Sequence, residues 1–322
     1  MLRARGITIV GSYNVGLFLK GQRLPATGET IVADSFVEGA GGKGSNQAIT
    51  AAKFGAPTTF VGRIGADSYG RYALDLYRRL GISTDLITVD ESTHSGISII
   101  LIDSVGRNMI SVALGANLHL SPADLDRALP TIKRSFAVGY QLENDLDTVL
   151  YGLRISREAG TRTYLDPAPA TPLPDNIYPC VDVIKPNETE ASTLTGIDVR
   201  DAASAAAAGA WFVERGVGAA IVTLGAAGAV LVRDGQSRHY PAPPVQAVDT
   251  TGAGDIFSGA FLASLSAGKA LDEAIVFANA AAALSTERIG VVESIPEPEA
   301  VARLLQARPA NWRTTAKPQS SD

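Results

Sequence analysis

Short apolar runs alternate with longer segments of helical period along most of the chain. Each apolar run ends at glycine, proline or polar residues before it reaches the length of a helix. The strand-like runs lie at 7–12, 58–65, 136–143, 162–169, 181–187 and 219–225, and the helix-like segments at 43–55, 68–81, up to about 159, and about 201–215. Continuous apolar strands separated by helices are typical of a parallel sheet covered on both faces. The pattern therefore predicts an α/β fold with a central, mostly parallel sheet between two layers of helices.

Two segments depart from this alternation. Residues 15–37 are interrupted by proline and glycine and show no helical period. Residues 95–114 have the pattern of a β-hairpin that turns near Gly106. Together they predict a small β-sheet lid over the strand ends, formed by residues from about 15–40 and 92–115.

Composition is that of a globular protein with a sizeable core. The 322 residues are 46% apolar and 19% charged, and no internal repeat divides them. We assign residues 1–312 to a single α/β domain that includes the β lid. Residues 313–322 are polar and contain a proline, which predicts a disordered tail.

Charge and targeting signals exclude several classes of protein. The net charge is −5 with a pI near 5.3 and no block of Lys or Arg, which disfavours nucleic acid as a partner. Cys180 is the single cysteine, and the three histidines are not at metal-ligand spacing. The apolar run after Arg5 is too short for a signal peptide, and no window reaches the roughly 18 apolar residues of a membrane span. We therefore expect a soluble, cytoplasmic protein without a membrane partner.

In parallel sheets, ligand sites lie just beyond the carboxyl ends of the strands. Several polar residues and one glycine occupy such positions in the predicted strands. They are Asn14, Glu143, Asp166, Asn187 and Gly225.

The stretch EGAGGKGSNQA, residues 38–48, matches two nucleotide-binding motifs superficially. A dinucleotide fingerprint must follow a core strand and precede an acidic residue by about 20 positions, and neither condition is met here. A P-loop needs Gly where this chain has Val37, and Ser or Thr where it has Gly44. What remains is a glycine-rich turn that opens a helix and presents Lys43 and Asn46 to a ligand. An ordinary glycine-rich turn explains the stretch equally well.

The stretch DTTGAGD, residues 249–255, carries a clearer chemical signal. Gly252, Ala253 and Gly254 lead into an apolar helix, so their N–H groups would form an anion-binding nest at its positive end. Asp255 lies at the mouth of this nest, where it could accept a proton from an attacking hydroxyl while the amides stabilise a phosphoryl group. A helix N-terminus lowers the pKa of an aspartate, but phosphoryl transfer through a loose transition state needs only a weak base. The alternative is that Asp255 is merely a favourable acid in the first helical turn.

Four motifs, in this order, resemble the ribokinase (PfkB) family of carbohydrate kinases. They are GGKGSNQA at 41–48, NETE at 187–190, TLGAAG at 223–228 and DTTGAGD at 249–255. The resemblance extends from about Ile7 to Leu305, and the spacing is most similar to the ribokinase branch. It implies a ribokinase-like fold, ATP and Mg²⁺ as cofactors, K⁺ as an activating ion, a small sugar as substrate, and a homodimer formed through the β lid.

The resemblance also implies roles for individual residues. Asp255 would be the catalytic base, with the amides of Gly252, Ala253 and Gly254 as the anion hole. The sugar would contact Asn14, Gly42, Lys43, Asn46 and Glu143, with Gly16 at a further sugar-facing position. The nucleotide would contact Asn187, Thr223, Gly225, Gly228 and Asn279, and Glu190 would organise Mg²⁺ through water. A monovalent-cation loop, acting partly through backbone carbonyls, would include Asp249, Thr251, Ser285, Arg288, Gly290 and Ser294.

Gly16 departs from the family pattern. Ribokinases carry an aspartate at this point of the early strand, where it accepts hydrogen bonds from sugar hydroxyls, whereas this chain reads Asn14-Val15-Gly16. The missing carboxylate puts ribose in doubt, and we expect it to leave room for an altered sugar. We therefore predict an enzyme that uses ATP to phosphorylate the primary hydroxyl of ribose or a related pentose or polyol.

Two alternatives remain open. A nucleoside or modified-sugar kinase of the same family could place Phe18 against a base. A sugar- or nucleotide-binding protein without catalysis is a different class, and the intact Asp255 with its nest argues against it.

Overall fold

A ten-stranded sheet forms the centre of the computed structural model, which describes residues 5–307 and 315–316. Seven strands pair in parallel, in the order β11-β10-β9-β8-β1-β4-β5. They are β1 (Ile7–Val10), β4 (Thr58–Gly65), β5 (Ser83–Asp90), β8 (Ala137–Tyr140), β9 (Arg162–Leu165), β10 (Val183–Ile184) and β11 (Ala219–Thr223). An antiparallel edge continues the sheet through β12 (Ala229–Arg233), β13 (Gln236–Tyr240) and β14 (Thr315–Ala316).

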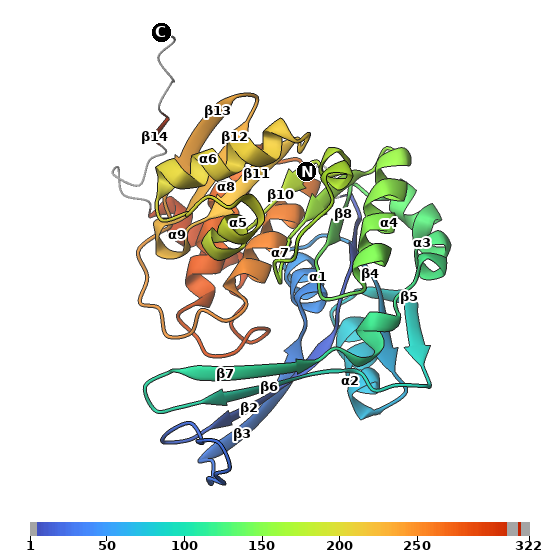
Figure 1. Cartoon of the computed structure of the whole chain (residues 1–322), viewed down its shortest axis with the longest axis vertical. Helices are drawn as coiled ribbons and strands as arrows, with labels where there is room; N and C mark the ends of the chain where they lie inside the picture. Colours follow the sequence, from blue (N-terminus) through green and yellow to red (C-terminus); the bar gives the residue numbers. More distant parts are fainter. Residues whose placement is uncertain (1–4, 308–314, 317–322) are drawn as a thin grey trace.

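Helices cover both faces of this sheet (Figure 1). One layer contains α1 (Lys43–Lys53), α2 (Ser68–Arg79), α7 (Ala253–Ser266), α8 (Leu271–Ser285) and α9 (Pro298–Gln306). The other contains α3 (Pro122–Arg134), α4 (Leu146–Glu158), α5 (Glu188–Thr195) and α6 (Ala202–Glu214). Successive strand residues face opposite layers, so Ile9 packs with the first layer and Val10 with the second. The predicted α/β fold is confirmed.

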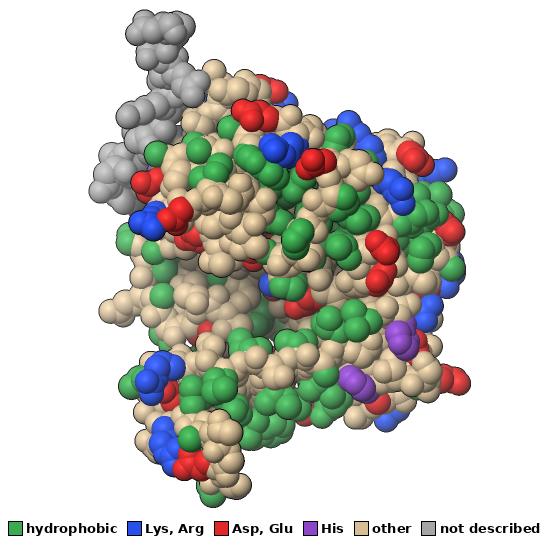
Figure 2. All heavy atoms as spheres, viewed as in Figure 1, with side chains coloured by type: hydrophobic (Ala, Val, Ile, Leu, Met, Phe, Trp, Pro, Cys, Tyr) green, Lys and Arg blue, Asp and Glu red, His purple; other side chains and the backbone are tan. Residues whose placement is uncertain are grey.

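A separate four-stranded sheet unites the two segments predicted to form the lid. Its order is β3 (Ser35–Gly41), β2 (Asn14–Lys20), β6 (Gly96–Ile102) and β7 (Asn108–Ala113), with β2 and β6 parallel and the outer pairs antiparallel. In Figure 1 it extends beside the main body, and Figure 2 shows a hollow between the two. We call it the small sheet.

The two faces of the small sheet differ in their surroundings. Asn14, Gly16 and Phe18 share one face, and Gly39 lies opposite Gly16 on that same face. A Cβ atom at Gly39 would lie 3.8 Å from Oε1 of Glu293 in the main body. The face that carries Asn14 is therefore turned toward the main body.

Two residues of the predicted C-terminal tail add a short strand to the edge of the main sheet. Of the predicted tail, 313–322, only Thr315 and Ala316 are among the described residues, and they pair with β13. The rest of that segment lies outside the described residues. In the part of the chain that the structure describes, no helix has the length and apolar character needed to cross a membrane.

Candidate active site

The start of α1 meets the ends of β1 and β8. Oε2 of Glu143, just beyond β8, accepts hydrogen bonds from Oγ of Ser12 (2.5 Å) and from the backbone N–H of Lys43 (2.8 Å). A carboxylate at this place stabilises the positive end of the helix. Gly42 has a positive φ of 88°. A Cβ atom at this position would lie 2.7 Å from the backbone nitrogen of Asn14, so only glycine fits here. The glycine-rich stretch thus brings Lys43 beside Glu143 and Asn14.

Asp255 lies in the first turn of α7, and only 6% of it is exposed. Its Oδ2 accepts a hydrogen bond from Nδ2 of Asn46 (2.9 Å), and its Oδ1 accepts one from Nε2 of Gln47 (3.3 Å). Both amides come from α1, so the helix that carries residues predicted to bind the sugar also orients the predicted base. Oδ1 of Asn46 is buried without a protein partner among the described residues, which leaves an acceptor for a ligand.

Charge in this region is concentrated on a few buried or half-buried groups. Burial raises the pKa of the Asp255 carboxyl, and nearby Asp166 raises it further, while Lys43, Asn46 and Lys185 oppose this rise. Burial alone would lower the pKa of Lys43. The carboxylates around it, with Asp255 first, outweigh that effect and raise it above its ordinary value. Lys43 therefore stays protonated beside a base that holds its proton more strongly than an exposed aspartate.

The turn before α7 presents backbone N–H groups next to Asp255. Gly252 adopts a left-handed conformation with φ of 75° and caps the helix. The N–H of Ala253, predicted to be part of the nest, donates to the carbonyl oxygen of Thr250 at 3.2 Å. The N–H groups of Gly252, Gly254 and Asp255 have no acceptor among the described residues. The backbone N–H groups that are available to bind an anion therefore lie on either side of Ala253.

A second buried carboxylate lies behind Asp255. Oδ2 of Asp166 accepts hydrogen bonds from Lys185 (2.9 Å), Gln47 (3.0 Å) and Ser258 (3.1 Å). The strand-end rule indicated Asp166, but sequence reasoning missed Lys185, Gln47 and Ser258. Only Lys185 offered a signal, because it directly follows a buried strand.

The predicted nucleotide side is formed by the start of α5 and the turn after β11. Asn187 caps α5, and both oxygens of Glu190 accept hydrogen bonds from Asn187, at 2.8 Å from its backbone N–H and 2.9 Å from its side chain. Thr223 forms a parallel bridge with Asn187. Burial and then Asp166 raise the pKa of Glu190. Two further predicted residues, Gly228 and Asn279, both lie against Tyr240, with Nδ2 of Asn279 donating to its carbonyl oxygen at 2.9 Å.

The family model of the pfkB carbohydrate kinases matches residues 4–298. The chain belongs to this family. It is an ATP-dependent carbohydrate kinase, and the predicted family is confirmed. A ribokinase of Haemophilus influenzae is 37% identical over 300 residues, which are 93% of this chain and 98% of the relative. A deoxyribokinase of Salmonella typhi is 37% identical over 256 residues, covering 79% of this chain and 84% of the relative.

A solved structure of a relative agrees with this assignment. Arabidopsis thaliana ribokinase complexed with ribose and ATP superposes with a TM-score of 0.86 at 33% identity, covering 94% of this chain and 99% of that one.

The predicted cation loop of this kinase joins two segments beside α7. Asp249 accepts hydrogen bonds from the backbone N–H groups of Thr251 (2.9 Å) and Gly290 (3.1 Å). The N–H of Arg288 donates to the carbonyl oxygen of Ser285 at 3.3 Å, and the Oγ of Ser294 donates to Val291 O at 2.8 Å. Asp249 therefore links Thr251 to Gly290. The bonds of Ser285, Arg288 and Ser294 are to neighbours within their own segment.

Gly16 of this kinase does not leave free space. A Cβ atom at Gly16 would lie 2.7 Å from Cε2 of Phe18, whose ring folds back over the glycine. The expectation that the missing carboxylate leaves room is therefore wrong, because residues two apart on a strand share one face. Neighbouring Asn14 is buried, and its Oδ1 accepts a hydrogen bond from Nδ2 of Asn117 at 2.9 Å.

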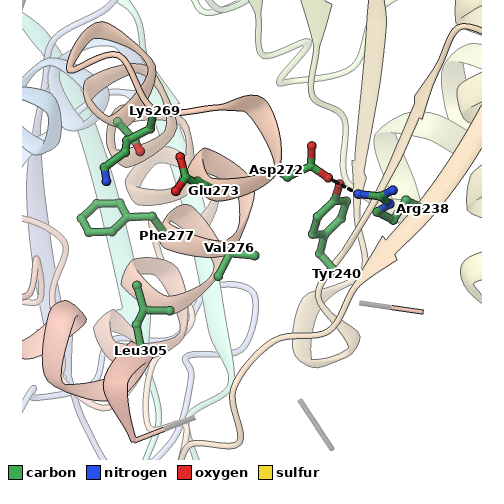
Figure 3. A pocket seen from close by; sticks show the side chains of 9 residues that line it. Arg238, Tyr240, Lys269, Asp272, Glu273, Val276, Phe277 and Leu305 are labelled. Atoms are coloured by element: carbon green, nitrogen blue, oxygen red, sulfur yellow. Dashed lines mark hydrogen bonds and ion pairs between the residues drawn. The ribbon is translucent and has the colours of Figure 1, made fainter. Parts of the chain in front are cut away.

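A surface cavity of about 470 Å³ lies elsewhere, between β13, α8 and α9 (Figure 3). Asp272 in its wall pairs with Arg238 and Tyr240, so these polar groups satisfy one another. The cavity shares no residue with the sugar or nucleotide positions predicted for the family. This cavity is therefore separate from the candidate active site around Asp255.

Proposed function

We propose that this kinase phosphorylates the primary hydroxyl of a pentose or a closely related small sugar, with Asp255 as the base. The observation that carries the proposal is the buried Asp255 carboxylate, held by Asn46 and Gln47 beside unpaired backbone N–H groups and charged Lys43. The ATP requirement also favours a cytoplasmic location.

The residues present suit an in-line transfer. The hydroxyl oxygen of the sugar would form a bond to the γ-phosphorus while the bond from that phosphorus to the bridging oxygen of ADP breaks. The hydroxyl proton would pass to Asp255. The N–H groups of Gly252 and Gly254 would stabilise charge on the phosphoryl oxygens, and Lys43 adds a fixed positive charge nearby.

Mg²⁺ fits the acidic side of this site. Oδ1 of Asp166 is buried and has no protein partner among the described residues, and Glu190 is close enough to Asp166 for its pKa to be raised. When bound with ATP, the ion would neutralise phosphate charge. We propose that Glu190 holds it through water, because both of its oxygens already accept hydrogen bonds from Asn187.

A monovalent cation is the second ion that we propose. The donor set of the cation loop suits a large, hard ion, because Asp249 supplies a negative charge between segments rich in backbone carbonyls. We expect kcat/KM to rise about tenfold when K⁺ replaces tetramethylammonium at equal ionic strength, because the loop fixes the turn before α7. Initial rates with K⁺, Na⁺, Cs⁺ and tetramethylammonium measure this. Equal rates with all four cations would refute the proposed cation site.

The ring of Phe18 over Gly16 favours a sugar with one hydroxyl fewer than ribose. A sugar hydroxyl next to this ring gives up its hydrogen bond to water without finding a charged acceptor, whereas a methylene group does not. One lost charged hydrogen bond is worth about 1.5–3 kcal/mol, which corresponds to roughly 10–150-fold in kcat/KM. The relatives include a deoxyribokinase as well as ribokinases. We therefore propose deoxypentoses as candidate substrates alongside ribose.

A panel of pentoses, deoxypentoses, ketoses and polyols, assayed with ATP, tests both proposals. We expect phosphorylation of at least one pentose, with ribose not the best substrate. The variant Gly16→Asp/Phe18→Ala, in which the ring no longer blocks the carboxylate, should shift preference toward ribose, and Phe18→Ala alone is its control. Turnover of none of these sugars would refute the proposed substrate class. A wild-type lead of more than tenfold for ribose would refute only the role of Gly16.

The outward face of the small sheet supports the proposed homodimer. Leu17, Leu19, Phe36, Ile99, Leu101 and Met109 lie on the face opposite Asn14. Phe36, Ile99 and Met109 are 58%, 44% and 54% exposed, and hydrophobic side chains gather over the small sheet in Figure 2. Exposed apolar residues that gather on one face are typical of protein interfaces, which supports the homodimer.

We expect Ile99→Asp to convert a dimer into a monomer in sedimentation velocity, because it places a charge in the interface. Val89→Asp is the matched control, since Val89 is 47% exposed on β5 of the main sheet. A wild-type protein that sediments as a monomer at every concentration tested would rule out the dimer.

A further inference from the structure

Lys185 is a buried cation without a role in the chemistry described so far. It follows β10, and its side chain is 4% exposed. Its ammonium donates to Oδ2 of Asp166 at 2.9 Å and to the carbonyl oxygen of Gly254 at 3.2 Å. Burying a charge is costly unless it is paired, and these two contacts stabilise the ammonium in this place.

The second contact reaches the reaction centre directly. The Gly254 carbonyl belongs to the peptide group whose N–H is that of Asp255. Oγ of Ser258 lies 2.9 Å from the same carbonyl oxygen and 3.1 Å from Oδ2 of Asp166, so its single hydroxyl proton can be donated to either. Lys185 and Ser258 therefore hold one side of this peptide group, while its N–H, without an acceptor among the described residues, is on the other side.

The first contact affects the proposed base through charge. A single amide nitrogen, Nε2 of Gln47, bridges the carboxylates of Asp166 (3.0 Å) and Asp255 (3.3 Å). Two buried carboxylates this close cannot both stay ionised without a compensating cation. Lys185 is the cation that touches Asp166.

We propose that Lys185 is a positioning residue: it compensates the charge of Asp166 and fixes the Gly254 peptide group, which keeps Asp255 ionised and the N–H groups beside it in place for the phosphoryl group. The inference rests on the proposed role of Asp255 as base. It adds a residue that acts through others and does not touch the substrates.

The titration of Asp255 provides a readout that a merely structural role would not change. Asp255 faces Lys43 from α1, Asp166 after β9 and Lys185 after β10, while Glu143 and Glu190 act on Lys43. Without Lys185, the pKa of Asp255 should rise further, because burial and Asp166 then act with less opposition. A base works only when it is deprotonated. The acidic limb of the pH profile of kcat, where kcat rises with pH, therefore moves to higher pH.

The test compares Lys185→Met with Lys185→Arg in the full-length enzyme, using the best sugar of the panel. For Lys185→Met we expect a loss of roughly 10–100-fold in kcat and a shift of the acidic limb by about one pH unit or more. Lys185→Arg should keep the limb of the wild type. Lys53→Met is the matched control, because Lys53 also pairs with a carboxylate (Glu297, 3.9 Å) and a carbonyl (Ile295, 3.4 Å), away from Asp255.

The outcomes separate this inference from the proposed function. Wild-type protein that phosphorylates no sugar refutes the proposed function. An active wild type together with a folded Lys185→Met that has wild-type kcat and pH limb overturns only the role of Lys185.

If Lys185→Met does not fold, Asp166→Asn/Lys185→Met replaces the buried pair by neutral side chains. This variant should regain the acidic limb of the wild type, because the charges of Asp166 and Lys185 are removed together. An acidic limb that lies well above that of the wild type in the double variant would overturn the proposal.

Discussion

Replacing Asp255 by Asn is expected to lower kcat by roughly 10²–10⁴-fold, the range for losing a general base. An asparagine has nearly the same shape and can still accept a hydrogen bond from Asn46. It cannot take the proton of the attacking hydroxyl. The substitution also removes one of two neighbouring buried carboxylates, so the free energy of unfolding should change little or increase. Steady-state kinetics and thermal unfolding of the same preparation measure both effects.

Asp272→Asn is the matched control for this prediction. Asp272 is likewise an acid in the first turn of a helix, α8, and it pairs with Tyr240 and Arg238 on the surface. If Asp255 were only a favourable first-turn acid, the two variants would behave alike, with a modest loss of stability and normal turnover. Near wild-type kcat in folded Asp255→Asn would therefore refute its role as base.

Gly252→Ala should reduce kcat by about 10²-fold or more, the loss typical of a displaced anion-hole donor. A Cβ atom at Gly252 would lie 2.5 Å from Cγ1 of Val291, and the φ of 75° is unfavourable for any L side chain. The turn must shift to relieve both problems. Its shift moves the N–H groups of Gly252 and Gly254 away from the phosphoryl position.

Gly268→Ala separates this effect from backbone strain alone. Gly268 follows the other end of α7 with φ of 87°, and a Cβ atom there would meet nothing within 4 Å. It should cost about 1–2 kcal/mol of stability and leave turnover unchanged. Equal kcat values for the two alanine variants, measured with saturating sugar and ATP, would contradict a role for the Gly252 turn in stabilising the phosphoryl group.

Local patterns predicted the α/β elements and the motif at the start of α7, whereas contacts between distant residues were not predictable. The start of α7 was recognisable because glycines, an acid and an apolar helix follow one another within DTTGAGD. The pairing of Asn46 with Asp255 spans 209 positions, and no local pattern encodes it. For the same reason Gln47 was indistinguishable from an ordinary helical glutamine.

The orientation of side chains was also not predictable from the sequence. The pattern of residues 14–18 predicted a glycine facing the sugar, but not that the ring of Phe18 turns back to cover it. Likewise, the glycine-rich motif before Asp255 predicted three nest amides. The structure gives the N–H of Ala253 an acceptor within the turn. The orientation of a side chain and the partner of an N–H group depend on the packing of the whole site. Neither the composition nor the hydrophobic periodicity of the sequence contains this information.

The distance in the fold between Gly16 with Phe18 and the proposed base has a consequence for how this enzyme can diversify. Gly16 and Phe18 belong to the small sheet, while Asp255 and its partners belong to helices of the main body. Effects of substitutions that share no partners add nearly independently. A library confined to β2 and β6 can therefore explore new acceptors while the phosphate-transfer apparatus is inherited unchanged, so new specificities can evolve without first losing catalysis.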